Sequence, residues 1–223
     1  MDDEITVENV NYIYDDKNGI EIILSRQSEI SYPLHNHVSV FTFGVVLEGE
    51  VAIEIAGHRR TYIKGQSYGI PPYMPHQITA VLPYTMLTVC IPKECWKQEA
   101  DYVCQKDYEA KEGKLTNLLG SELKEKLERF PEERITVEEM ARLAAVSKYH
   151  FIRLFKQEMG MTPHQFQLQN RIRKAQRLLK QSEAVTKVAM EAGFCDQSHF
   201  IRQFEKTVGL KPTAYKKVCF VLD

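Results

Sequence analysis

The stretch HFIRLF at residues 150–155 recurs as HFIRQF at residues 199–204, 49 positions further along the chain. The match continues as GMTP at 160–163 against GLKP at 209–212. Upstream, ARLA at 141–144 answers AMEA at 189–192 with an offset of 48, so one residue is inserted in the intervening turn. A repeat of this extent predicts two copies of one structural unit in the second half of the chain.

Each copy has the pattern of a helix, a short turn and a second helix. The first helices are predicted over residues 136–144 and 186–192, and Thr136 with Glu139 can form a capping box. Each second helix has a capping oxygen at its start, a glycine at its end and a proline just beyond: Ser147, Gly160 and Pro163; Asp196, Gly209 and Pro212. Two helix-turn-helix units follow from this pattern.

The second helix of each unit has one apolar face and one polar face. The phenylalanines recur at helical spacing and are expected to pack on the first helix, which leaves the polar face free. Arginine can make paired bonds to guanine, and Gln, Ser and His can reach base edges. One such helix alone would more simply be a solvated surface, but two in a basic region favour DNA binding. The predicted DNA-binding residues are Lys148, Tyr149, Ile152, Arg153 and Lys156, with Gln197, Ser198, His199 and Arg202.

Residues 163–181 between the units are predicted to form one long helix. At ~1.5 Å per residue it spans roughly 27 Å, close to the ~34 Å between successive major-groove faces. One chain could therefore place its two reading helices in consecutive grooves. Four basic residues of this helix are candidates to help bind phosphates, and a structural role is the alternative for some of them: Arg171, Arg173, Lys174 and Arg177.

The net charge of −1 divides unevenly along the 223 residues. Residues 1–110 hold 8 Lys and Arg against 16 Asp and Glu, a net of −8, whereas residues 111–223 hold 21 against 14, a net of +7. This asymmetry indicates that only the second half meets a polyanion. No run of ~18 apolar residues is present, and the acidic start of the chain is unlike a secretory signal, so the cytoplasm is the expected location.

The first half has the pattern of short strands separated by turns. Segments such as 41–47, 51–55 and 85–91 are β-branched or aromatic, and glycine or proline separates them. We therefore predict a two-domain α+β protein, with an N-terminal antiparallel β-barrel and a C-terminal all-α domain. The expected divisions are a sensor domain at 1–92, a helical linker at 93–114 that could dimerise, and a DNA-binding domain at 115–223. The five cysteines, among them Cys90 and Cys195, are expected to be reduced thiols.

The repeat resembles the AraC/XylS family of bacterial regulators over about residues 115–217. The first unit carries S-x3-F-x-R-x-F-K-x3-G-x2-P from Ser147, and the second carries A-x3-G-F-x-D-x-S-x-F-x-R-x-F from Ala189. The resemblance implies that the second helix of each unit enters the major groove. Ile152 departs from the polar residue expected at its position. The resemblance also implies an N-terminal domain that senses an effector, a homodimer on double-stranded promoter DNA, and RNA polymerase as a partner of an activator.

The first half resembles a cupin barrel. Its first motif is approximated by His35, His37 and Gly49, and its second by Gly65-x5-Pro71-x-Tyr73-x2-His76. In metal-binding cupins, histidines and a carboxylate converge inside the barrel. Here Thr42 occupies the carboxylate place and Tyr73 replaces the usual glycine.

Because the carboxylate is missing, three hypotheses about the ligand of the barrel remain open. It binds a small organic effector, or it binds a divalent metal through His35, His37 and His76, or it binds nothing and only dimerises. No cofactor is required for the first or third reading. The residues expected around an effector are His35, His37, Phe43, Tyr73 and His76.

The favoured function is that of a transcription regulator that binds DNA in response to a small molecule, and not that of an enzyme. A metal cupin enzyme with an appended DNA-binding domain is the alternative from another class, but the lost carboxylate and the lack of an obvious general base count against it. A constitutive DNA binder is a further alternative.

Overall fold

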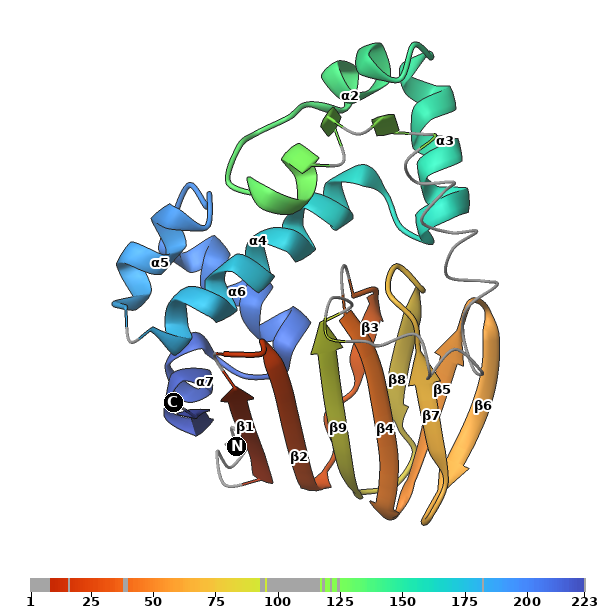
Figure 1. Cartoon of the computed structure of the whole chain (residues 1–223), viewed down its shortest axis with the longest axis vertical. Coiled ribbons are helices and arrows are strands. Elements are labelled where there is room, and N and C mark those ends of the chain that lie inside the picture. The colour runs from red at the N-terminus through yellow and green to blue at the C-terminus, as the bar shows by residue number, and fades with distance from the viewer. Residues whose placement is uncertain are drawn as a thin grey trace.

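A computed structural model of the chain describes residues 9–222 except 16, 38, 39, 93, 94, 96–116, 118, 121, 124 and 182. The strands form the lower part of the molecule and the helices lie above and beside them (Figure 1). The predicted two-part α+β architecture is confirmed, with strands in the first half of the chain and helices in the second.

The N-terminal half is a sandwich of two sheets. One sheet has the strand order β10-β1-β2-β9-β4-β7 and the other has the order β3-β8-β5-β6. The apolar core between them includes Val46, Ile53 and Tyr84, each fully buried. The strands are β1 (Val10–Asp15), β2 (Ile20–Ser28), β3 (Tyr32–His35), β4 (Val40–Glu48), β5 (Glu50–Ile55), β6 (His58–Ile63), β7 (Ser67–Ile70), β8 (His76–Ala80) and β9 (Tyr84–Pro92).

The C-terminal half contains the two repeated helical units joined by one long helix. The described residues between 117 and 129 are helical and precede the first unit. The further elements are α2 (Val137–Leu143), α3 (Lys148–Met159), α4 (Pro163–Lys180), α5 (Val185–Glu191), α6 (Gln197–Val208), α7 (Pro212–Val218) and β10 (Cys219–Leu222). In Figure 1, α4 runs diagonally between the two units and above the strands.

The helix ends described next lie where the sequence predicted them, with one exception. Ser147 and Asp196 cap α3 and α6, and Gly160 and Gly209 end them in the left-handed conformation, with φ of 71° and 81°. The prediction that the first helix of the second unit begins at Thr186 was wrong. That helix, α5, begins at Val185 after Ala184, which makes no side-chain cap. Burial of its apolar face, and not a cap, therefore fixes its start.

The cores of both helical units include residues of the β-sandwich. Tyr73 packs in the cluster of the first unit, which is built around Phe151 and Phe155. Val10 and Tyr12 of β1 pack in the cluster of the second unit, where the rings of Tyr12 and Tyr215 lie 4.8 Å apart. The two halves of the chain are therefore joined by shared apolar cores.

The last strand adds the end of the helical half to the sandwich. β10 pairs in parallel with β1, with Tyr12 opposite Cys219 and Asp15 opposite Leu222. These four residues form the one strand among the described residues of the C-terminal half, and their aromatic and β-branched composition suits a strand. Pairing here covers the edge of the larger sheet.

The linker predicted at 93–114 lies outside the described residues, apart from Cys95. The four cysteines that the structure describes are free thiols, with Cys90 buried and Cys195 exposed. Among the described helices, none combines the length and apolar character that crossing a membrane requires.

Candidate functional site

A cavity of about 780 Å³ lies between the β-sandwich and α4. Its walls therefore come from both halves of the chain. The sandwich contributes His35, His37, His76, Ile23, Ile78 and Met86, and α4 contributes Gln169, Arg173, Gln176, Arg177 and Lys180.

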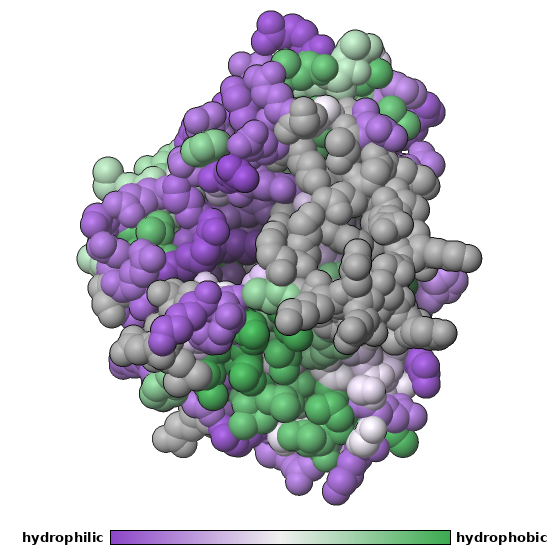
Figure 2. Space-filling model, in the orientation of Figure 1, coloured by the Kyte–Doolittle hydropathy of each residue, from purple (hydrophilic) through white to green (hydrophobic). Residues whose placement is uncertain are grey.

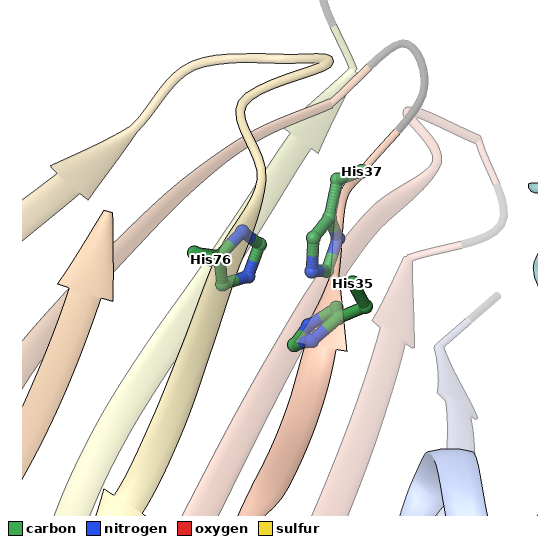
Figure 3. Close-up of side chains that lie close together, drawn as sticks. All are labelled: His35, His37 and His76. Atoms are coloured by element: carbon green, nitrogen blue, oxygen red, sulfur yellow. The ribbon is translucent and has the colours of Figure 1, made fainter. Parts of the chain in front are cut away.

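Three histidine rings converge on one side of this cavity (Figure 3). His35 ends β3, His76 begins β8, and the two residues pair across the strands. The ring centroids of His35 and His76 lie 4.1 Å apart, and that of His37 lies 5.2 and 5.1 Å from them. Each ring offers one nitrogen to a group whose nitrogens all lie within 4.8 Å of one another.

Burial keeps these rings neutral, and hydrogen bonds orient two of them. The Nδ1 of His35 lies 2.7 Å from the Pro33 carbonyl oxygen, and the Nδ1 of His76 lies 2.9 Å from that of Met74. Each Nδ1 must donate to its carbonyl, so each Nε2 keeps a lone pair. Burial lowers the pKa of His35 to about 4 and holds the pKa of His37 and His76 well below the usual value.

The loop that carries the histidines is bonded directly to α4. Asn36 is completely buried, and its backbone N–H donates to Oε1 of Gln169 over 3.3 Å. The Gln169 amide donates in return to the Asn36 side-chain oxygen over 3.1 Å. The carbonyl oxygen of Asn36 also accepts from Gln169 and from the guanidinium of Arg173. The residue between His35 and His37 thus contacts the helix that joins the two helix-turn-helix units.

A second polar contact joins α4 to the sandwich further along the helix. The Lys180 ammonium lies 2.8 Å from a carboxylate oxygen of Glu21 on β2, and 3.7 Å from the ring centroid of Tyr14. The hydroxyl of Tyr215 donates to the same carboxylate over 3.4 Å. Because this ion pair is largely enclosed, it fixes the position of the α4 end relative to β2.

The polar faces of α3 and α6 lie away from this cavity and are open to solvent. Tyr149 is 83% exposed, and Lys148, Arg153 and Lys156 are exposed beside it, whereas Ile152 is half-buried. On α6, Gln197, Ser198 and Arg202 are exposed and His199 is half-buried against the ring of Phe194. Lys148 pairs with Glu138 of α2, and Arg153 lies 3.2 Å from the His150 ring. The predicted DNA-binding residues therefore form equivalent surfaces on the two units.

Comparison with known proteins identifies both halves. Residues 140–217 match the helix-turn-helix domain family, and residues 26–90 match the cupin domain family. The chain therefore combines a cupin domain in its first half with a helix-turn-helix domain of the AraC type in its second half.

Curated relatives named as transcriptional regulators match about two fifths of this chain. An uncharacterized HTH-type transcriptional regulator of Haemophilus influenzae is 38% identical over 88 residues, which are 39% of this chain and 30% of the relative. The probable transcriptional regulator LumQ of Photobacterium leiognathi is 34% identical over 91 residues, 40% of this chain and 37% of LumQ. The chain thus spans about a third of the length of these relatives.

One solved structure matches both halves of this AraC-type chain together. Unsaturated fatty acid bound ToxT from Vibrio cholerae matches with a TM-score of 0.59 at 10% identity, over 89% of this chain and 94% of ToxT. The two proteins share their fold, including the combination of a β-rich half with a helical half.

A cupin domain can bind a divalent metal, and the donors present fit one in part. Three neutral imidazoles, two with Nδ1 donating to a carbonyl, are a suitable set for zinc or a similar ion. Thr42, at the carboxylate place, instead has its hydroxyl 3.7 Å from the Cys90 sulfur. After burial, the charge of Arg173 also lowers the pKa of all three histidines, so it opposes a second cation beside them.

The cavity brings together four of the five residues expected around an effector. His35, His37, Tyr73 and His76 line it, whereas Phe43 does not. Strand alternation explains the position of Phe43, because Val40 of β4 lines the cavity and Phe43, three positions on, faces the other side of the sheet.

Sequence reasoning missed the AraC-type half's contribution to the pocket. Arg173 was expected at DNA phosphates, yet it lines the cavity and bonds Asn36, while Lys174 pairs with Glu132 and Arg171 donates to the Pro131 carbonyl. Helical periodicity predicted the helix, but it carries no information about which face meets the barrel.

Proposed function

We propose that this chain is a DNA-binding transcription regulator that reads promoter DNA through α3 and α6 and responds to a small molecule bound in the cavity. The sensor half is the cupin domain, placed at 1–92, and the DNA-binding half is the region from 115 onward. Such a protein acts in the cytoplasm, where the bacterial chromosome lies.

The observation that carries the proposal is the exposure of equivalent polar faces on two repeated helices. Phe151 and Phe155 of α3 are completely buried, as are Phe200 and Phe204 of α6, so each helix has one fixed face. The opposite faces carry arginine, lysine and amide groups that suit phosphate and base contacts. Because α4 joins the two units rigidly, both faces can engage one duplex.

Selection from random double-stranded DNA with the full chain tests this reading. We expect enrichment of a site with two contacted segments about one helical turn apart, roughly 10 base pairs. Binding should weaken steeply with salt, because basic groups release counterions from phosphates. Recovery of no common sequence would count against sequence-specific regulation.

The cavity supports a sensing role because it touches both halves. A ligand there would contact the histidine loop and α4 at once, and α4 sets the relation of the two reading helices. Thermal melts of the full chain with a panel of metabolites test this, since any ligand that binds the folded state raises Tm. An operator affinity that no stabilising compound changes would favour the constitutive binder.

Metal-dependent sensing is a second candidate, favoured by the two oriented Nε2 lone pairs of His35 and His76. His35, His37 and His76 would hold the ion. Metal analysis of protein purified without a histidine tag tests it. We expect any bound metal to be lost in His35→Ala/His76→Ala, and retention of metal by that variant would place the ion elsewhere.

A homodimer is proposed to form through the outer face of the larger sheet. The side chains there alternate with those that face the cavity, and Ile22 lies opposite Val89 and Leu24 opposite Leu87. Figure 2 shows a hydrophobic area on this side of the molecule. Apolar areas of this kind on soluble proteins usually mark interfaces.

Light scattering on the full chain tests the dimer. Leu24→Glu should shift the mass toward that of a monomer, whereas Ile63→Glu, at a residue 51% exposed on the other sheet, is the matched control. Equal masses for the wild type and both variants would remove this face as the interface.

A further inference from the structure

The cavity wall formed by α4 is strongly basic. Arg173, Arg177 and Lys180 all line it, at positions i, i+4 and i+7 of one helix face. Two carboxylates, Glu21 and Glu128, line the same cavity. Glu21 pairs with Lys180 and accepts from the Tyr215 hydroxyl, and Glu128 accepts from the Tyr73 hydroxyl over 2.6 Å. Neither is within ion-pair distance of an arginine of α4.

Arg173 forms no direct ion pair within the described part of the chain. Its guanidinium donates to the carbonyl oxygen of Asn36, and no described carboxylate lies within 4.0 Å of it or of Arg177. A guanidinium has five N–H donors arranged as a planar fork. One backbone carbonyl accepts from few of them, so most of the donors of Arg173 remain available. An enclosed charge without a counterion is costly, so an anion in the cavity would stabilise this arrangement.

We infer that the cavity binds a small organic anion, whose carboxylate or phosphate group bonds to Arg173 of α4. This inference rests on the proposed function, in which the cavity takes the effector, and it names the chemical class of that effector. A carboxylate and a phosphate both accept paired bonds from the guanidinium fork, so the geometry of the donor suits either group.

The remainder of the ligand faces a mixed wall. Ile23, Ile78 and Met86 of the sandwich provide apolar surface, and the neutral Nε2 atoms of His35 and His76 provide acceptors. A volume of about 780 Å³ is within the range of pockets that enclose drug-sized molecules. The site therefore suits an anionic head on a largely apolar body, with hydroxyl or amine groups toward the histidines.

The position of Arg173 gives this anion a direct route to the DNA-binding half. The guanidinium donates to the Asn36 carbonyl oxygen between His35 and His37, so an anion that bonds the remaining donors of Arg173 is linked through this side chain to the histidine loop. Gln169 keeps its bonds to Asn36 one helical turn earlier. Binding of the anion is therefore coupled to the position of α4 relative to the histidine loop.

Three probes with one body and different heads test the inference on the full chain: 1-naphthoate, 1-naphthyl phosphate and the neutral 1-naphthamide. We expect at least one of the two anions to raise Tm at matched ionic strength, and the amide to raise it much less. Which anion acts distinguishes a carboxylate effector from a phosphate effector. Equal shifts with the amide, or no shift with any probe at millimolar concentration, would overturn the inference.

Arg173→Met supplies the second arm of the test. It should weaken the anion's apparent affinity by about 10-fold or more, as expected for loss of a charge-assisted bond. Arg173→Lys keeps the charge but lacks the planar fork of donors, so its affinity for the anion should lie between those of the wild type and Arg173→Met. Arg142→Met, at an exposed arginine of α2 outside the cavity, is the matched control. Unchanged affinity in a folded Arg173→Met variant would make Arg173 only a link between the domains.

DNA binding measured in parallel separates this inference from the proposed function. If the selected DNA site is bound but the anions raise Tm no more than the amide does, the proposed regulator function is supported and the inference of an anionic effector is refuted. If the anions bind through Arg173 but no DNA sequence is selected, the anion site is supported and the proposal of sequence-specific DNA binding is refuted.

Discussion

Gly160, which ends the first reading helix, packs directly on the ring of Pro75, the residue before His76. A β-carbon at Gly160 would lie 2.4 Å from the Pro75 ring. The equivalent residue of the second repeat, Gly209, has the same relation to the barrel, since a β-carbon there would lie 2.6 Å from Ile30. The two reading helices therefore rest on the cupin domain through corresponding residues, and both adopt a conformation that favours glycine.

Gly160→Ala should destabilise the protein through both the backbone and this contact. A left-handed alanine costs roughly 1–2 kcal/mol, and displacement of the Pro75 ring adds a comparable amount, typically about 1–3 kcal/mol for overpacking. Urea unfolding of the full chain measures the sum. Gly57→Ala is the matched control, because Gly57 has φ of 86° and a β-carbon there would meet no atom within 4 Å. Equal losses in the two variants would show that the contact between the domains contributes nothing.

Tyr73→Phe should weaken the junction between the cupin domain and the first helix-turn-helix unit. Tyr73 is 1% exposed, has φ of 61°, and donates its hydroxyl to Glu128 over 2.6 Å. Loss of a hydrogen bond to a charged group costs about 1.5–3 kcal/mol. Differential scanning calorimetry of Tyr73→Phe beside Tyr62→Phe, a buried tyrosine in the sandwich core, measures the difference. A Tm loss no greater than that of Tyr62→Phe would contradict it.

Tyr73 also shows which features of the site the local sequence could predict and which it could not. The cupin motif expects glycine at position 73, and the left-handed φ of Tyr73 shows that the backbone there still has a glycine-like conformation. The motif predicted the pocket position of this residue. It could not predict why a tyrosine is tolerated, because its ring packs among residues such as Leu123 and Phe151, far along the chain.

Local rules also predicted the repeat, the caps at Ser147 and Asp196, and the convergence of the three histidines. Each depends on short spacing or on a motif. The contacts of Asn36 with Gln169 and Arg173 join residues more than 130 positions apart, and no periodicity encodes them. The position of Phe43 outside the cavity could not be predicted for a different reason, because the face of β4 on which it lies depends on a register that the sequence left open.

Acid should destabilise the metal-free protein through the histidine cluster. Burial lowers the pKa of His35 from 6.5 to about 4, and that of His37 and His76 falls in the same direction. The unfolded chain then binds more protons than the folded chain between pH 6.5 and 4. Stability is complete above that window and should fall by about 1.4 kcal/mol per pH unit for each histidine within it.

Urea unfolding at several pH values with a chelator present measures this slope. His35→Gln/His37→Gln/His76→Gln should flatten it, whereas His58→Gln, at an exposed histidine of β6, should leave it unchanged. A slope that persists in the triple variant would assign the acid sensitivity to other groups.

Arg153→Ala and Arg202→Ala should each weaken binding to the selected DNA site by ~1–3 kcal/mol, because an arginine that bonds guanine contributes about that much discrimination. Both side chains are exposed, one on each reading helix, at equivalent positions of the repeat. Electrophoretic or fluorescence titrations with the selected site and a scrambled duplex measure the change. Arg142→Ala, an exposed change on α2, serves as the control and should have little effect.

The ratio of the two affinities identifies what each arginine contacts. If Arg153→Ala weakens the selected site and leaves the scrambled duplex unchanged, the arginine reads a base. If it weakens both equally and lowers the salt dependence, it contacts phosphate. Because α4 joins the units rigidly, we expect both variants to lose sequence preference, each in its own segment of the site. Loss confined to one variant would mean that a single unit reads sequence and the other only holds the backbone.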